Sequence, residues 1–554
     1  MSKIIGITGW KDVGKTYYAS LIIKSLVKKG YKVGSIKHAH HDFDIDKPGT
    51  DSFKHREAGS SQVIISSSKR WAKITENNRA HEKSLDELIK EFYNVDIVVV
   101  EGFKKDNHPK IEILTKGLNN RNKETKNVIA IVSNDLKDTT IPVFKENDIE
   151  NLATIIALDN GKTIEDAIGS IKRGVEVIDF AVSMPNVLKG ESSEVSPGIN
   201  CVMTHEPIGV VSGITPFNFP VMVPLWMIPL AITAGNTFIL KPSEQTPLAA
   251  IKLAEYLEKA GLPKGVFNVV HGSKDIVEAI CDHPKIKAVA FVGSSKVAEI
   301  VYSRSTQKKK RAICLGGAKN HMIVVPDADV DSTAKGLLAS SMGSAGQRCM
   351  AASVAVGVED VDHIIDQLIN EANQFKLGRD MGTIISKASL DRITNYINEA
   401  EKMGAKVLLD GRNAKVPSEY SSGYWIGPTI LDYVNPDWAC ATDEIFGPVL
   451  SIIRVPTIEK AMEIENNSQY GNAAAVFTTS GEIAKIVTDS ASSGMVGINI
   501  GVPVPRDPFS FGGWNESKYG HGDITGVSGV NFWTNLKKTT SRWPESSQEW
   551  KKYF

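Results

Sequence analysis

The sequence predicts an α/β protein in which helices alternate with parallel strands, in a first module and in a larger second half. Up to about residue 156, short β-rich runs alternate with helical runs, which is typical of strand–helix–strand units. Residues 94–101 (NVDIVVVE) and 127–133 (NVIAIVS) are continuous apolar runs, as expected of strands that helices cover on both faces. The remainder, about 400 residues, alternates strand-like and helical runs with frequent glycines, and this length predicts at least two further domains.

The first elements of the chain can be placed individually. Residues 4–8 predict a strand, residues 15–29 a helix that ends at Gly30, and residues 32–37 a second strand. At the junction of the two halves, residues 149–161 (IENLATIIALDNG) predict a helix.

Composition excludes several classes of protein. Lys and Arg (64) balance Asp and Glu (64), so no electrostatic reason exists to expect nucleic acid or an anionic membrane as a partner. The five cysteines are odd in number and contain no Cys-x-x-Cys pair, which disfavours a disulfide framework or a structural zinc site. Residues 219–240 are apolar but contain three prolines, which favours a buried segment over a membrane span. The first residues lack the pattern of a secretory signal, so we expect a cytoplasmic protein that acts on small molecules.

A phosphate-binding motif occupies residues 9–16 (GWKDVGKT), which fit G-x-x-x-x-G-K-[ST] between a predicted strand and a predicted helix. Glycines in such a loop let backbone N–H groups surround phosphate oxygens, a lysine adds positive charge, and a threonine hydroxyl can bind Mg²⁺. This context favours a phosphate site over a simple glycine-rich turn. The predicted nucleotide-binding residues are Gly9, Asp12, Val13, Gly14, Lys15 and Thr16.

Acidic residues are expected on the metal side of this site. Glu101 ends the apolar strand and Asp96 precedes it, although each could equally be an ordinary charge at a strand end. We therefore predict Thr16 and Glu101 as Mg²⁺ ligands. Residues 37–51 (KHAHHDFDIDKPGTD) concentrate histidines and aspartates. Metal binding is one interpretation of that loop, and a polar loop that faces phosphate or a partner is the one we favour.

Together these motifs resemble the MobB family of molybdopterin-guanine dinucleotide biosynthesis adapter proteins over nearly the whole of residues 1–156. The segments that carry the resemblance are GWKDVGKT, SIKHAHHDFDIDKPGTDSFKHREAG, SSSKRWA and VVVEGFK. The resemblance implies a module that binds GTP and Mg²⁺, is weak as a GTPase, and has molybdenum-cofactor assembly proteins as partners. An N-K-x-D guanine motif is absent, so the preference for GTP rests on the resemblance alone.

Three features of the second half point to a reactive thiol near a dinucleotide. Cys349 lies among small residues in GSAGQRCMA, where a substrate could approach its sulfur, although a single cysteine is more often part of a core. Asn218 in ITPFNFP is an amide in an apolar loop and could donate to an oxyanion. Gly293 and Ser294 lie between a strand-like and a helical run, so a pyrophosphate could bind at that helix N-terminus.

The ordered segments ITPFNFP, LKPSEQTP, FVGSS, GGAKN, GQRC and EIFGP identify the second half as a member of the aldehyde dehydrogenase superfamily. The resemblance implies Cys349 as the nucleophile, Asn218 as the oxyanion donor and NAD as the cofactor. It also implies that Lys241 and Glu244 contact the adenosine ribose, and that Glu244 disfavours NADP because a carboxylate repels the extra phosphate. The other implied NAD-binding residues are Ser294 at the pyrophosphate, Glu444 at the nicotinamide ribose, and Thr215, Phe217, Gln245, Gly293 and Gly316.

One substitution bears on the acyl acceptor. Family members that hydrolyse their thioester carry a glutamate in E-L-G-G-K, which activates water. Leu315 stands at that position in LGGAKNH, so a thiol such as coenzyme A is the expected acceptor unless another base substitutes. GGAKNH, GQRCMA and GVPVP further resemble the CoA-acylating methylmalonate-semialdehyde dehydrogenases. That resemblance implies that Arg173 and Arg348 hold the substrate's carboxylate.

The combined resemblances imply a bifunctional chain. The dehydrogenase would oxidise methylmalonate or malonate semialdehyde with NAD and coenzyme A to propionyl-CoA or acetyl-CoA, as a homo-oligomer. The expected domains are the P-loop module (1–156), an NAD-binding domain (157–312), a catalytic domain with the reactive cysteine (313–455), and a return to the NAD domain with a bridging segment (456–554).

Two departures from the family bear on activity. The dehydrogenase match begins only near Asn151, so the family's N-terminal segment is missing, and residues 375–385 (FKLGRDMGTII) are shorter than the family's loop there. Apolar core surface is therefore expected to be exposed or to be covered by another part. Three interpretations stay open: two working modules, a working adapter with an inactive dehydrogenase, and an accidental gene join. The intact motifs favour the first.

Overall fold

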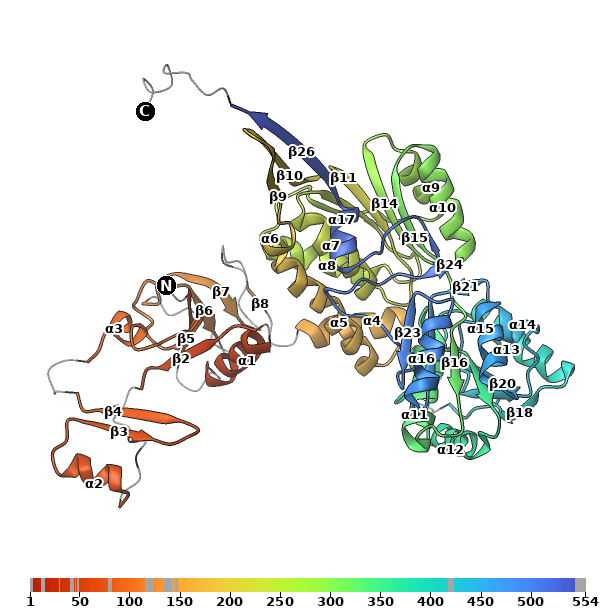
Figure 1. Cartoon of the computed structure of the whole chain (residues 1–554), viewed down its shortest axis with the longest axis horizontal. Helices are drawn as coiled ribbons and strands as arrows, with labels where there is room; N and C mark the ends of the chain where they lie inside the picture. The colour runs from red at the N-terminus through yellow and green to blue at the C-terminus, as the bar shows by residue number, and fades with distance from the viewer. Residues whose placement is uncertain are drawn as a thin grey trace. The chain divides into compact units, whose positions relative to one another are not determined.

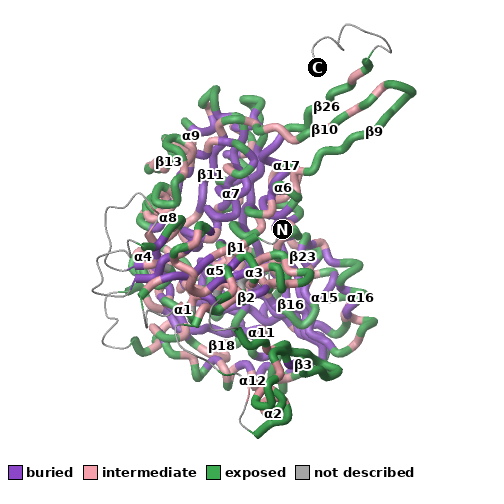
Figure 2. The backbone as a smooth tube through the Cα atoms, turned by 90° about the vertical axis from the view of Figure 1, so that its left-hand side faces the viewer, coloured by how far each residue is buried: buried purple, intermediate pink, exposed green. Residues whose placement is uncertain are grey.

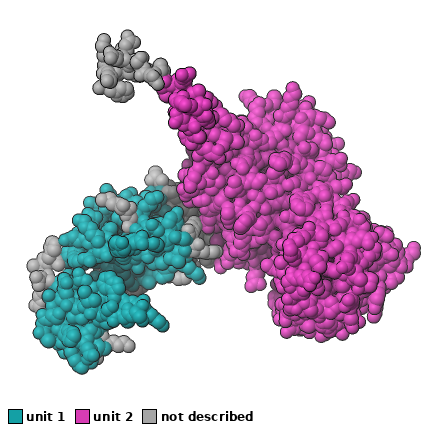
Figure 3. Space-filling model, viewed as in Figure 1, with its two compact units in different colours: residues 1–148 teal, residues 149–554 magenta. Residues whose placement is uncertain are grey.

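The computed structural model describes residues 3–10, 15–28, 30–39, 44, 46, 49–77, 82–114, 124–133, 141, 143–144, 148–416 and 423–543. They belong to two compact units, Met1–Asp148 and Ile149–Phe554 (Figure 3). The division lies before the boundary expected after Ile156, because the helix that follows it packs into the second unit. Leu152, Ala153 and Ile156 of this helix share a core cluster with residues further along the second unit.

The first unit contains a parallel sheet of six strands in the order β2-β5-β1-β6-β7-β8 (Figure 1). Helix α1 lies against it, because Ala19 joins Ile7 and Val99 in one core cluster. The predicted parallel sheet is confirmed. The elements of this unit are β1 (Lys3–Gly9), α1 (Lys15–Lys28), β2 (Val33–Lys37), α2 (Asp51–Glu57), β3 (Gln62–Ser66), β4 (Trp71–Thr75), α3 (Leu85–Ile89), β5 (Ile97–Glu101), β6 (Lys110–Ile113), β7 (Val128–Val132) and β8 (Val143–Phe144).

A separate hairpin, β3–β4, carries helix α2 beside it. Arg56 on α2 connects three carboxylates, since its guanidinium lies 2.8 Å from Asp44, 3.5 Å from Asp46 and 2.8 Å from Glu76 of the segment after β4. The two aspartates of the polar loop therefore act as partners of an arginine. His40, His41 and Asp42 of the same loop lie outside the described residues.

The second unit begins with helices and an exposed hairpin and then forms a six-stranded sheet, β13-β12-β11-β14-β15-β25. All neighbours in this sheet are parallel except β15 and β25. The elements up to this sheet's fifth strand are α4 (Asp148–Asn160), α5 (Ile164–Val182), α6 (Met184–Val187), β9 (Glu191–Ser196), β10 (Ile199–Pro207), β11 (Val210–Ile214), α7 (Met222–Thr233), β12 (Thr237–Lys241), α8 (Leu248–Lys259), β13 (Phe267–Val269), α9 (Lys274–Asp282), β14 (Ile286–Val292), α10 (Ser295–Gln307) and β15 (Arg311–Leu315).

Helices cover both faces of this sheet. Along β14, Ala288 and Ala290 belong to the core cluster that contains Met227 of α7, whereas Val289 and Phe291 belong to the cluster that contains Val301 of α10. Successive side chains of a strand point to opposite faces, so β14 is apolar throughout because both of its faces are buried. The α/β class predicted from continuous apolar runs is confirmed.

A second sheet of seven strands has the order β18-β19-β20-β17-β16-β22-β23. It extends beyond Val455, where the catalytic domain was expected to end, because β22 and β23 pair in parallel next to β16. The remaining elements are β16 (His321–Val324), α11 (Val330–Met342), η1 (Gly343–Gly346), β17 (Val354–Val358), α12 (Asp362–Asn373), α13 (Lys387–Met403), β18 (Lys406–Leu409), β19 (Thr429–Asp432), α14 (Ala439–Thr442), β20 (Val449–Val455), α15 (Ile458–Asn466), β21 (Tyr470–Gly471), β22 (Ala473–Phe477), α16 (Gly481–Ser490), β23 (Met495–Ile498), β24 (Trp514–Asn515), β25 (Lys518–Tyr519), α17 (Gly526–Phe532) and β26 (Thr534–Arg542).

The chain's last described strand returns to the start of the second unit. β26 pairs antiparallel with β10, and β10 with β9, in a three-stranded sheet that projects from the second unit and is largely exposed (Figure 2). The apolar segment 219–240 forms α7, which is buried over nearly its whole length. Among the described residues, no helix is long and apolar enough to cross a membrane.

Several apolar side chains are exposed on neighbouring helices of the second unit. Leu158 of α4 is 81% exposed and Val182 of α5 is 70% exposed, and Leu248 and Ile251 of α8 are also exposed. Isolated exposed apolar residues are common, but here they recur on three helices, α4, α5 and α8, in the first part of the second unit. Exposed apolar surface of this kind is what the sequence analysis predicts for the second unit, and what covers it stays a prediction.

Asn236 joins the end of the chain to the first large sheet. Its side-chain oxygen accepts hydrogen bonds from the backbone N–H groups of Ile208 (2.8 Å) and Gly209 (2.9 Å). Its amide nitrogen donates to the carbonyls of Ala231 and Trp533, both at 2.9 Å. The residue is buried, so one side chain satisfies four backbone groups that water does not reach.

We expect Asn236→Ala to destabilise the second unit by about 2–4 kcal/mol, because it leaves buried N–H and C=O groups without partners. Urea denaturation measures the loss, and hydrogen exchange should show faster exchange in β10 and β26. The exposed Asn373→Ala at the end of α12 is the matched control, with a change below about 0.5 kcal/mol. Equal effects of both substitutions would contradict the role of Asn236.

Candidate active site

Cys349 follows a short stretch of unusual backbone. Ser344, Ala345 and Gly346 have φ values of 52°, 54° and 68°, which is the left-handed region that side chains other than glycine rarely adopt. At Gly346 a Cβ atom would lie 2.0 Å from the carbonyl oxygen of Gly447, so only glycine fits there. The chain turns sharply out of α11 and brings Cys349, half-buried, against the core cluster of the first large sheet.

Two buried asparagines hold the carbonyl group of Cys349. Asn320, which precedes β16, donates to this oxygen at 3.0 Å, and Asn472, which precedes β22, donates to it at 3.1 Å. The peptide group at the cysteine is therefore oriented by the second large sheet. Sequence reasoning missed both residues, and the signal it could have used is an asparagine directly before each of the apolar runs that form β16 and β22.

Asn218 lies next to the same loop. Its buried amide nitrogen donates to the carbonyl of Gln347 at 2.9 Å, two residues before the cysteine. The Gln347 side chain is held in turn by the carbonyl of Thr383 and the N–H of Ile385. An amide nitrogen carries two hydrogens, so Asn218 keeps one that can point at an oxygen beside Cys349.

Burial keeps the thiol protonated in this state. Burial raises the pKa of Cys349 to about 12, and the negative charge of Glu444 contributes to the rise. Burial also raises the pKa of Glu444 to about 7. Two interactions oppose this rise: the N–H of Ala318 donates to the carboxylate at 3.0 Å, and Lys319 contributes positive charge. Burial lowers the pKa of Lys319 to about 8. The titrations of Cys349 and Glu444 are coupled, because ionised Glu444 opposes formation of the thiolate.

The position of the absent glutamate is apolar in this structure. Leu315 ends β15 and is buried in the cluster against which Cys349 packs, together with Trp226, Met350 and Phe511. A general base must reach the water that it activates, directly or through one water molecule. Leucine offers no such group, so nothing at this position can activate water beside the cysteine.

The predicted dinucleotide-binding residues meet at one edge of the first large sheet. Thr215, Gly293 and Gly316 directly follow β11, β14 and β15, and Lys241 ends β12. These are carboxyl ends of parallel strands, where open α/β sheets bind their ligands. Lys241 lies 2.8 Å from the Glu244 carboxylate, and Gln245 beside it is exposed.

Three local features fit a dinucleotide at this edge. The buried hydroxyl of Thr215 has no hydrogen-bond partner among the described residues. Ser294 caps α10 without a side-chain hydrogen bond, which leaves the helix N-terminus open to an anion. The Glu444 carboxylate lies so close to Gly317 that a Cβ there would be 2.6 Å from its oxygen. Phe217 meets the ring of Phe446 edge-on, with centroids 5.8 Å apart.

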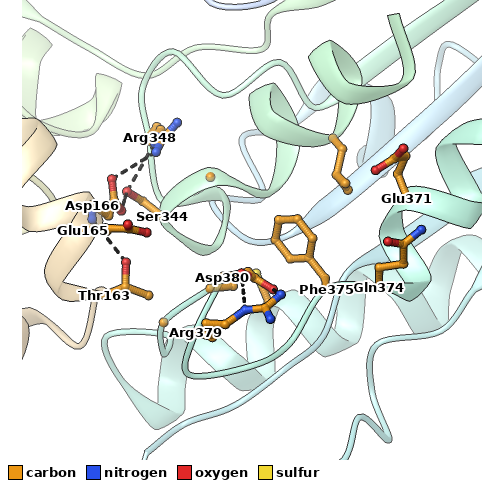
Figure 4. Close-up of a pocket in the computed structure, with 14 residues that line it drawn as sticks. Thr163, Glu165, Asp166, Ser344, Arg348, Glu371, Gln374, Phe375, Arg379 and Asp380 are labelled. Carbon is orange, nitrogen blue, oxygen red and sulfur yellow. Dashed lines mark hydrogen bonds and ion pairs between the residues drawn. The ribbon is translucent and has the colours of Figure 1, made fainter. Parts of the chain in front are cut away.

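The two arginines expected at the substrate's carboxylate are each engaged elsewhere. Arg348 donates to Asp166 at 3.1 Å and to the Ser344 hydroxyl at 3.2 Å (Figure 4). Arg173 lies 2.9 Å from Glu176 on the same helix, α5. In this state both guanidinium groups are therefore paired with carboxylates of α5.

The phosphate-binding motif of the first unit is described in part. Asp12, Val13 and Gly14 lie outside the described residues. Gly9 ends β1, and the Lys15 ammonium donates to the carbonyl of Trp10. The Thr16 hydroxyl lies 2.9 and 3.0 Å from the two oxygens of Glu101, so the structure brings both predicted metal ligands together.

Comparison with known proteins agrees with both halves of this picture. The model of the aldehyde dehydrogenase family matches residues 142–539, and that of molybdopterin guanine dinucleotide synthesis protein B (MobB) matches residues 4–134. The chain is 44% identical to a malonate-semialdehyde dehydrogenase of Pseudomonas aeruginosa, over 72% of this chain and 82% of the relative. It is 46% identical to malonate-semialdehyde dehydrogenase 1 of Geobacillus thermodenitrificans, over 71% and 83%.

Solved structures give the same result. A putative methylmalonate-semialdehyde dehydrogenase from Sinorhizobium meliloti, complexed with NAD, superposes with a TM-score of 0.71 at 43% identity, covering 73% of this chain and 84% of that chain. The methylmalonate-semialdehyde dehydrogenase from Oceanimonas doudoroffii also gives 0.71, at 44% identity, over 72% and 84%. These matches confirm both resemblances identified from the motifs.

The coupling of Cys349 and Glu444 predicts how pH changes thiol reactivity. Below about pH 7 Glu444 is protonated, so Glu444→Gln should alkylate at Cys349 as fast as the unchanged protein. Above pH 7 the carboxylate opposes the thiolate, and Glu444→Gln should react about three- to tenfold faster with iodoacetamide. Peptide mass spectrometry measures the rate at Cys349.

The exposed Glu482→Gln on α16 is the matched control for loss of one negative charge. It should leave the rate at Cys349 unchanged at every pH. If Glu444→Gln accelerated alkylation equally at pH 6 and pH 9, the ionised carboxylate would not be the cause.

Proposed function

The chain belongs to the aldehyde dehydrogenase family, and from that premise we propose that it oxidises malonate or methylmalonate semialdehyde with NAD and transfers the acyl group to coenzyme A. The observation that carries the choice of acceptor is Leu315. It is buried in the cluster against which Cys349 packs, at the position where hydrolytic members carry their base. Similarity to malonate-semialdehyde dehydrogenases supports the choice of substrate.

In this proposal Cys349, once ionised, attacks the aldehyde carbon. Asn218, whose amide lies at the loop that carries the cysteine, donates to the resulting oxyanion together with the N–H of Cys349. Asn320 and Asn472 hold the carbonyl of the same residue, which orients the peptide group that follows the cysteine. NAD, when bound, supplies the hydride acceptor. Lys241, Glu244, Ser294 and Glu444 would hold it, and the open Thr215 hydroxyl fits a polar ligand.

Loss of hydride leaves a thioester on Cys349. The apolar surroundings of Leu315 offer no base for water, so the intermediate persists until the thiolate of coenzyme A attacks its carbonyl carbon and Cys349 leaves. The acyl group derived from methylmalonate semialdehyde would lose its carboxylate as CO₂ before transfer and give propionyl-CoA. The one derived from malonate semialdehyde would give acetyl-CoA. Arg348 and Arg173 are the groups proposed to hold that carboxylate first.

The test follows NADH absorbance of the purified full-length protein with either semialdehyde and NAD, with and without coenzyme A. We expect turnover that depends on coenzyme A by at least about tenfold, because Leu315 cannot act as the base that hydrolytic members carry at this position. Cys349→Ala should abolish turnover, and Cys440→Ala, which alters a buried cysteine of α14, is the control. Equal rates with and without coenzyme A would contradict the proposed acceptor. No turnover by a folded protein would contradict the oxidation itself.

For the first unit we infer binding of a nucleoside triphosphate with Mg²⁺, and an adapter role in molybdenum-cofactor assembly, with GTP as the nucleotide. The match of residues 4–134 to the MobB model supports this role. The Thr16 hydroxyl, held 2.9 Å from the Glu101 carboxylate, is suited to bind Mg²⁺, since hydroxyl and carboxylate oxygens are ligands that this ion prefers.

Lys15→Ala should weaken GTP binding by at least about tenfold, because it removes the cation of the phosphate loop. A fluorescent GTP analogue measures the affinity, and NADH formation should not change if the two modules act independently. Lys24→Ala, an exposed lysine of α1, is the matched control. Loss of both GTP binding and NADH formation in Lys15→Ala would contradict independence.

A further inference from the structure

Arg348 is turned toward the start of helix α5. Its guanidinium lies 3.1 Å from the Asp166 carboxylate, and its Nε donates to the Ser344 hydroxyl at 3.2 Å, which donates in turn to Asp166 (Figure 4). The side chain lines a cavity of about 470 Å³, and neither Cys349 nor Asn218 lines that cavity. In this state the guanidinium of Arg348 is paired with Asp166 at this cavity.

Asp166 has two cationic neighbours, Arg348 and Lys162. Lys162 lies 3.9 Å from Asp166 and 3.5 Å from the Ser344 hydroxyl, so two cations share one carboxylate. Burial lowers the pKa of Lys162 to about 8, which leaves it mostly charged at neutral pH. Burial raises the pKa of Asp166, but the charges of Lys162 and Arg348 outweigh this and lower it overall. The Asp166 carboxylate is therefore held ionised, as the partner of Arg348.

Arg173 lies two turns further along α5, on the same face as Asp166. A separation of seven residues corresponds to about 10 Å along a helix. Arg173 holds Glu176, while Arg348 holds Asp166. Each guanidinium group must therefore leave its carboxylate partner on α5 before it can bind the carboxylate of a substrate instead. The substrate reacts at Cys349, so the arginine within its reach is Arg348, the adjacent residue.

We propose that Asp166 competes with the carboxylate of the semialdehyde for Arg348, so that an acidic substrate binds by displacing Asp166 from the guanidinium. The inference rests on the proposed function. Arg348 is paired with a carboxylate both before and after the substrate binds, so the exchange of partners has a small free-energy cost. The substrate's binding free energy therefore includes only the difference between the two arginine–carboxylate pairs. A neutral aldehyde leaves the Asp166 pair intact. Asp166 is thus a specificity-determining residue that lowers the affinity for acidic substrates.

The test uses malonate, which has the substrate's carboxylate but no aldehyde, and isothermal titration calorimetry on the full-length protein without NAD. We expect Asp166→Asn to bind malonate about tenfold more tightly than the unchanged protein, because Arg348 is released. Glu165→Gln, which removes an exposed charge from the same cavity, should change the affinity less than about twofold. Arg348→Gln should abolish binding.

The same or weaker affinity in Asp166→Asn would overturn the proposal, as would binding that survives in Arg348→Gln or is absent from the unchanged protein. If Asp166→Asn fails to fold by circular dichroism, Ser344→Ala replaces it. This substitution removes one hydrogen bond from Arg348, and the affinity should rise about threefold. Unchanged or weaker binding in Ser344→Ala would then overturn the proposal.

Steady-state kinetics separate this inference from the proposed function. Asp166→Asn should lower KM for malonate semialdehyde and leave KM for propanal, a neutral aldehyde, unchanged. A purely structural role would alter both substrates alike and would overturn the competition. If malonate binds with the expected affinities but no NADH forms, the proposed oxidation is contradicted and the competition at Arg348 is supported. If NADH forms but Asp166→Asn binds malonate with unchanged affinity, the competition is overturned and the oxidation is supported.

Discussion

The backbone before Cys349 is the constraint on which the site depends. Ser344 and Ala345 occupy the left-handed region, which costs about 1–2 kcal/mol for each residue. Contacts around the loop offset this strain. Gly346 packs against Gly447, and the carbonyl of Cys349 accepts two hydrogen bonds from buried asparagines. The position of the sulfur is therefore decided by segments at β16 and β22, far from it in sequence.

Two carboxylates near this loop follow one pattern, because each lies beside groups of opposite charge. Glu444 accepts from the N–H of Ala318 near Lys319, and Asp166 lies between Lys162 and Arg348. Such pairs limit the cost of burying charge, yet they also engage groups that a substrate would need. The state described here is one in which the thiol is protonated and Arg348 is occupied.

The chain joins a region that matches the MobB model to an aldehyde dehydrogenase region, which spans 82–83% of the length of the two malonate-semialdehyde dehydrogenases compared above. Apolar residues such as Leu158 and Val182 are exposed on α4 and α5, but other residues of both helices belong to buried core clusters. The sheets, the cysteine loop and the edge that would receive a dinucleotide are all present. These observations favour two working modules over an inactive dehydrogenase behind a working adapter.

Local patterns in the sequence determined the class of each module and most of its elements. The apolar runs of β5 and β14 and the glycine-flanked phosphate loop each depend on neighbouring residues only, so they can be read without a fold. Motif order identified the family and suggested Cys349, Asn218 and the dinucleotide-binding residues, whose roles stay predictions. Tertiary structure alone decided that Asn320 and Asn472 hold the cysteine's carbonyl, that β22 and β23 extend the second large sheet, and that Asp166 occupies Arg348. Each of these depends on contacts between residues far apart in the chain, and such contacts form only when the packed sheets and helices bring those residues together.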